Sequence, residues 1–139
     1  MNREPIYAAL FAKFANIPGV VTVGRKLRHW ADVNPIEQPA LFQAQKSETA
    51  IRSTGLNPKW QLELTLYLYV NTSGDVSPTV TLNRIMDAVL TALQPLPGLM
   101  QTLGGLVHDC RVEGRIETDE GVMGDQAVAL IPVFIITAA

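Results

Sequence analysis

The sequence has one cysteine, Cys110, few aromatic residues (6%) and few charged residues (17%) among its 139 positions. A single cysteine allows no internal disulfide and provides no zinc-ligand spacing, so a reducing compartment is the simplest interpretation. The net charge of −2 gives no sign of the basic surface typical of nucleic-acid binders. The most apolar segment, Ala127–Ala139, is shorter than the roughly 20 residues that span a bilayer and contains Pro132. We expect a soluble protein with no membrane partner and no sequence-specific nucleic-acid partner.

Hydrophobic residues are abundant, at 47% of the chain, which argues against disorder. A chain of this length forms one ordinary domain with a core of its own, here residues 1–139. A weakly charged surface on such a domain is often covered by other subunits.

The strongest pattern in the chain is the alternation in Lys59–Asn71. Its apolar residues fall on one side of an extended chain, and its polar residues and two tyrosines fall on the other. A period of two predicts a half-buried strand, about 40 Å long at roughly 3.4 Å per residue. The other elements must pair with this strand or cover its apolar face.

Two segments have helical periodicity. Pro5 begins the first, in which Ile6, Leu10 and Phe14 share a stripe that Ile17 extends. The second stripe runs through residues 82–93 at spacings of three and four, after the expected N-cap and proline at 77–78. We expect this second helix to lie across the sheet.

Four further strands are expected, at Val20–Trp30, Ala40–Gln45, Leu106–Thr118 and Gln126–Thr137. The polar residues 46–58 are expected to form a long connection. Pro132 would place the last strand at a sheet edge or mark a bulge. The order α-β-β-β-α-β-β predicts an α+β fold, with a mostly antiparallel mixed sheet of about five strands and helices packed on one face.

No arrangement of side chains points to catalysis, so we expect no enzyme activity and no cofactor. His108 and Cys110 could form a metal or thiol–base pair, but no third ligand is near in sequence, and two core residues are the favoured interpretation. The acidic turn at 117–125 lacks the EF-hand spacing, so we interpret it as a solvated turn rather than a metal site. A small-molecule site between helix and sheet is the alternative class of function.

The order of segments resembles that of a known family. The segments that carry the likeness are Val23–Trp30, Gln38–Phe42, Lys59–Val70, Leu82–Val89, Gln101–Val107 and Gln126–Pro132. Together they resemble the tail terminator, or minor tail, proteins of long-tailed bacteriophages and prophages, and a related neck or tail-completion protein is the alternative. The resemblance implies a homo-oligomeric ring, a hexamer, with the tail-tube protein and the head–tail connector as partners. It also implies a place in the virion tail after assembly in the bacterial cytoplasm, and no catalytic residues.

Five charged residues are our candidates for the interface between subunits: Lys46, Arg52, Arg111, Glu113 and Arg115. The first two lie in the polar connection, a segment suited to becoming ordered on assembly. The other three belong to a run of alternating charge on one side of the expected strand Leu106–Thr118. Such alternation can match a neighbouring subunit, or it can be satisfied by pairing between strands of the same subunit.

Overall fold

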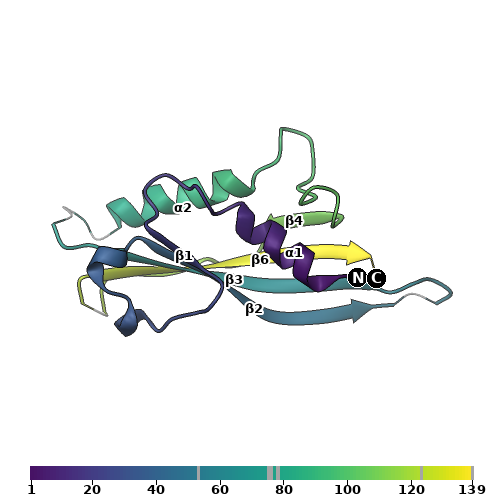
Figure 1. Cartoon of the computed structure of the whole chain (residues 1–139), viewed down its shortest axis with the longest axis horizontal. Helices are drawn as coiled ribbons and strands as arrows, with labels where there is room; N and C mark the ends of the chain where they lie inside the picture. Colours follow the sequence, from purple (N-terminus) through teal and green to yellow (C-terminus); the bar gives the residue numbers. More distant parts are fainter. Residues whose placement is uncertain (53, 75–76, 78, 123, 139) are drawn as a thin grey trace.

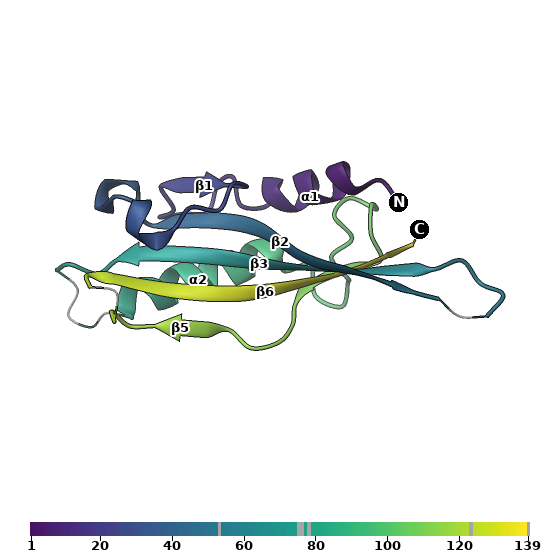
Figure 2. The same cartoon turned by 90° about the horizontal axis from the view of Figure 1, so that it is seen from below.

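A computed structural model describes residues 1–52, 54–74, 77, 79–122 and 124–138. Within these residues it contains two α-helices, two short 3-10 helices and one mixed sheet (Figures 1 and 2). The helices are α1 (Arg3–Ala12), α2 (Val80–Leu93), η1 (Trp30–Asp32) and η2 (Pro35–Glu37). The strands are β1 (Thr22–Gly24), β2 (Ala40–Ile51), β3 (Lys59–Asn71), β4 (Asp109–Val112), β5 (Glu117–Asp119) and β6 (Gln126–Ala138).

The sheet has the order β1-β2-β3-β6-β4, and β5 also lies beside β6. Strands β1 and β2 are parallel, whereas the other pairs are antiparallel. The expected α+β class is confirmed, with six strands in place of about five. Strand β3 has the predicted bounds and lies at the centre of the sheet, between β2 and β6.

Both helices cover the same face of the sheet (Figure 1). The alternate residues of β3 from Leu62 to Val70 are buried on this face, where they belong to one core with residues of α1 and α2. The stripe of α2 is as predicted, with Leu82, Ile85, Val89 and Leu93 buried. The expected proline at its start, Pro78, lies outside the described residues.

The expectation that Pro132 would place β6 at an edge or mark a bulge is wrong, because β6 has neighbours on both sides and its register with β3 runs through Pro132 without a shift. Strand β6 pairs with β3 along its whole length, and β4 and β5 occupy its other side. This outer neighbour is interrupted between Val112 and Glu117, beside Pro132, and Gly114 in the interruption has a φ of +110°. Because proline donates no backbone hydrogen bond, it is accommodated where the ladder is open.

The expected strand Leu106–Thr118 is therefore two short strands, β4 and β5, rather than one. Gly114 adopts a left-handed conformation that other residues rarely adopt, so the chain leaves the ladder there and returns at Glu117. The alternating pattern remained readable across the break because both pieces lie along the same side of β6.

The expected strand Val20–Trp30 is also wrong over most of its length, since only β1 joins the sheet. After Gly24 two arginine side chains form ion pairs outside the sheet. Arg25 binds Glu4, and Arg28 binds Glu37 through two hydrogen bonds. His29 caps η1 through its ring nitrogen. These contacts hold residues 25–37 as a separate coil with two turns of 3-10 helix.

The polar connection expected at 46–58 is shorter in the structure, because β2 continues to Ile51. Residues 47–51 pair with residues 59–63 of β3, so β2 and β3 form a long hairpin whose connection is 52–58. This part of β2 is exposed on both faces, except for half-buried Glu48. A strand exposed on both faces has no apolar alternation, and its backbone pairing alone defines it.

Candidate functional site: the open face of the sheet

The sheet has a second face, opposite α1 and α2, which we call the open face (Figure 2). Residues 30–33 cover one end of it, where Val33 belongs to a small cluster with Phe42, Tyr69 and Val128. The rings of Phe42 and Tyr69 lie 5.8 Å apart in this cluster, and the Tyr69 hydroxyl donates to the carbonyl of Arg28. The rest of the open face has no such cover in the described part of the chain.

An apolar stripe occupies the uncovered part of the open face. It consists of Leu130, Pro132 and Phe134 on β6 and Tyr67 on β3, and all four are half-buried. The alternate residues of β6, such as Ile131 and Val133, are buried in the core under the helices. Strand β6 is apolar on both faces, a pattern typical of a strand buried on both sides, whereas its side on the open face is only partly covered.

Three adjoining hollows run along this stripe and share lining residues, and together we call them the groove. The first two have volumes of about 200 Å³ each and share Thr65 and Pro132, and the third, of about 240 Å³, shares Glu117 and Leu130 with the second. The charged residues that line the groove are Lys46, Glu63, Glu113, Arg115, Glu117 and Asp119. Four carboxylates against two basic groups leave an excess of two negative charges.

Lys46 lies at one wall of the groove. A β-bulge between Gln45 and Ser47 places it on the open face, where its ammonium lies 4.8 Å from the ring centroid of Tyr67 and donates to the Tyr67 hydroxyl. A cation over an aromatic face is attracted by the ring quadrupole. Glu63, on the same wall, accepts a hydrogen bond from Ser47 at 2.9 Å.

Arg111 lies beyond the opposite wall, with its guanidinium 5.1 Å from the ring centroid of Phe134. It bonds Asp109 and Glu113, its neighbours two positions away on each side. The hydrogen bond that Arg111 donates to Asp109, together with the negative charges of Glu113 and Asp109, raises the pKa of Arg111. Asp109, Arg111 and Glu113 thus pair along one segment of the subunit itself, and not across strands as the alternative interpretation had it.

The structure places four of the five interface candidates on the open face: Lys46, Arg111, Glu113 and Arg115. Arg115 is exposed, and within the described residues no ion pair is found for it. Arg52 is apart from these four, exposed beyond the end of β2 in the hairpin connection. Sequence reasoning missed the apolar residues of the site, which are Tyr67, Leu130 and Phe134. The signal that could have revealed the two on β6 is that this strand is apolar on both faces.

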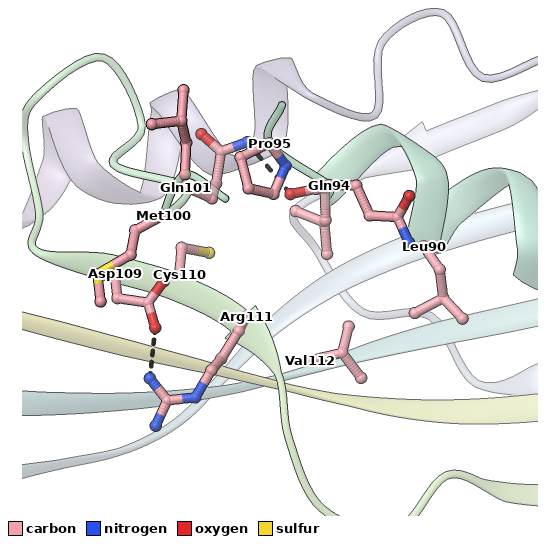
Figure 3. A pocket seen from close by; sticks show the side chains of 11 residues that line it. Leu90, Gln94, Pro95, Met100, Gln101, Asp109, Cys110, Arg111 and Val112 are labelled. Carbon is pink, nitrogen blue, oxygen red and sulfur yellow. Dashed lines mark hydrogen bonds and ion pairs between the residues drawn. The ribbon is translucent and has the colours of Figure 1, made fainter. Parts of the chain in front are cut away.

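A separate cleft lies between the end of α2, residues 94–101 and β4 (Figure 3). Its volume is about 380 Å³, and it is the place where a small-molecule site between helix and sheet would lie. Three of its polar side chains are already engaged: Asp109 binds Arg111, and the Gln101 amide bonds the Leu93 carbonyl and the Leu103 N–H. The cleft offers a largely apolar wall rather than a set of converging reactive groups.

Cys110 lies at the wall of this cleft and is 2% exposed. Burial raises the pKa of its thiol to about 12, so the thiol is protonated at neutral pH and is a poor nucleophile. The expected core position of His108 is wrong, since this side chain is exposed. The two residues share no contact that could support thiol–base chemistry.

The acidic turn does not assemble a metal site in the described part of the chain. No group of three or more histidine, cysteine, aspartate or glutamate side chains is close enough there to hold an ion. Asp119 instead accepts hydrogen bonds from the backbone N–H groups of Gly121 and Val122. Among the described residues, neither helix has the length and apolar character needed to cross a bilayer.

Comparison with solved structures places this architecture among known chains. A chain from the virion of a native gene transfer agent particle superposes with a TM-score of 0.59 at 10% identity, over 96% of this chain and 95% of that one. The fold is shared with a virion protein. A second solved chain, whose name states no function, gives a TM-score of 0.56 at 18% identity, over 99% and 96%. No family model and no curated protein matches the sequence.

Proposed function

We propose that this chain is a structural component of a phage-like virion, with the role of a tail terminator. Copies of it form a ring, a hexamer, that caps the tail tube, ends tube polymerisation and presents a surface to the head–tail connector. It acts without catalysis or cofactor, and it is assembled in the bacterial cytoplasm and retained in the virion tail.

The full-length likeness to the virion chain carries this proposal. The likeness covers 96% of this chain and 95% of that one. At 10% identity the likeness concerns the fold. The more specific role of tail terminator rests, in addition, on the resemblance in segment order described above.

The open face supports an assembled state. A groove with an apolar floor and charged walls is the composition of an interface that is exposed in a lone subunit. Further large apolar side chains are exposed in the segment after α2, namely Leu96, Leu99 and Met100, and the last two line the cleft beside β4. A virion subunit with several neighbours needs more than one such surface.

The experiment measures both oligomerisation and capping. The purified chain is examined by analytical ultracentrifugation and negative-stain microscopy, and is then added to tail-tube protein from the same genome during polymerisation. We expect rings and tubes that stop growing with a ring at one end. Rings that bind the connector but leave tube growth unaffected would favour the related neck or tail-completion protein. A monomer that binds neither partner would refute the proposal.

A further inference from the structure

We propose that the tip of the β2–β3 hairpin of one copy docks in the groove on the open face of the next copy. The occupant of the groove is therefore a second copy of this chain. The tip and the groove are then the two surfaces that join neighbouring subunits in the proposed ring. This inference rests on the proposed function.

The hairpin tip carries apolar and basic groups without acidic ones. Leu56 is 66% exposed and Ile51 is 46% exposed, although both side chains are large and apolar. Arg52 and Lys59 lie beside them, are exposed, and form no ion pair within the described residues. Residues 51–59 contain no aspartate or glutamate, so the tip has two positive charges.

The groove complements this tip in both respects. Its floor is apolar, formed by Tyr67, Leu130, Pro132 and Phe134, and its charged walls have an excess of two negative charges. Glu117 forms no ion pair in the described part of the subunit, so it remains available to a partner. Opposite net charges guide two surfaces together, and burial of Leu56 and Ile51 on the apolar floor stabilises the contact.

A chain cannot make this contact with itself. The tip projects along the long axis of the sheet, beyond the ends of the other strands and away from the groove (Figures 1 and 2). The groove lies among the middle residues of β3 and β6, which belong to the same rigid ladder as the hairpin. Tip and groove can meet only between copies.

The contact is heterologous, because it joins two different surfaces. Each copy then has one tip to donate and one groove to offer, and repetition gives a ring if the rotation closes. This also accounts for the separation of Arg52 from the other interface candidates. Arg52 belongs to the donated tip, whereas Lys46, Glu113 and Arg115 belong to the accepting groove.

Cysteine crosslinking of the full chain tests the contact. Leu56→Cys on the tip is combined with Thr65→Cys, which lies between the first two hollows, and the protein is oxidised with oxidised glutathione. A disulfide requires Cβ atoms about 3.5–4.5 Å apart, so it reports direct contact. The buried Cys110 does not compete. We expect a ladder of covalent oligomers on a denaturing gel.

Matched controls define a specific result. Leu56→Cys combined with Arg84→Cys, an exposed position on α2, is expected to remain monomeric on the same gel. A second pair, Leu56→Cys with Leu130→Cys, samples the adjoining hollow in case Thr65 is out of reach. A ring detected by ultracentrifugation in which neither groove pair crosslinks would overturn this inference and leave the proposed function standing. A chain that forms no ring and does not cap tubes would overturn both.

Charge exchange gives an independent readout that needs no cysteine. Lys59→Glu should weaken association at low salt by about two- to fivefold for each contact, the range of exposed ion pairs. Adding Glu117→Lys should restore it if the two residues face each other, and Arg84→Glu should leave association unchanged. Failure of every charge variant to alter the association constant at low salt would contradict the docking.

Discussion

The phenolic hydroxyl of Tyr7 donates a hydrogen bond to the carboxylate of Glu48, with 2.8 Å between the oxygens. The same carboxylate accepts from Nε of Arg3 at 2.6 Å, so one residue of β2 binds two residues of α1. Burial raises the pKa of Tyr7, with a further contribution from Glu48. The hydrogen bond from Arg3, followed by that from Tyr7, lowers the pKa of Glu48.

Tyr7→Phe should lower the free energy of unfolding by about 1–3 kcal/mol, because it removes a hydrogen bond to a charged group in a partly buried setting. Tyr67→Phe on the open face is the control: it removes an exposed hydrogen bond from Lys46, and should cost less than about 0.5 kcal/mol because exposed charged contacts contribute little. Urea denaturation measures both. Equal losses in the free energy of unfolding for the two variants would mean that the Tyr7–Glu48 hydrogen bond does not stabilise the packing of α1.

Glu48→Gln should destabilise the protein at pH 7 and not at low pH. A carboxylate whose pKa is lowered in the folded state stabilises above its unfolded pKa, about 4.3, and this stabilisation is lost as the pH falls through the folded value. The stability difference between the two proteins should therefore shrink below about pH 4. A difference that is constant with pH would contradict the role of the charge.

Leu66→Ala should cost about 2–5 kcal/mol, as expected for removing a large side chain from the core. Leu66 is fully buried beneath the helices, whereas Thr65 beside it points to the open face. Thr65→Ala should cost less than about 1 kcal/mol in the lone subunit. Denaturant melts at one protein concentration provide the comparison, and similar losses would mean that the two faces are assigned wrongly.

Cys110 should react with a thiol reagent only when the protein unfolds. Its thiol is buried, and its pKa is raised to about 12, so both access and thiolate population are low at pH 8. Modification followed by absorbance should be slow in buffer and fast in urea. His108→Ala should not change the native rate, and a fast native reaction would show that the β4 cleft opens in solution.

Gly114→Ala should destabilise the fold, by about 1–3 kcal/mol for backbone strain. The residue has a φ of +110°, and an added Cβ would lie 3.4 Å from Cγ of Pro132. Thermal melts measure the loss. An unchanged melting temperature would mean that the interruption between β4 and β5 does not depend on this glycine.

The sequence alone determined the elements that have one buried face. In β3 and α2 the core dictates which positions are apolar, so the spacing of apolar residues revealed the bounds of β3 and the buried stripe of α2. The α+β class followed from the order of these elements. The extent of β6 was also readable, because all of its residues from Ala127 to Ile136 are apolar.

Only the tertiary structure decided the elements whose pairing depends on distant residues. The outer half of β2 is a strand because β3 offers it backbone partners, and its exposed residues carry no periodic signal. The chain leaves the sheet after Gly24, where Arg25 pairs with Glu4 of α1 and Arg28 pairs with Glu37 of η2, both of which lie outside the sheet. The groove likewise could not be read from the sequence. Placing α1 and α2 on the same face is what exposes the apolar residues of β6 on the other, and pairing of distant strands brings Lys46 and Glu113 to its two walls.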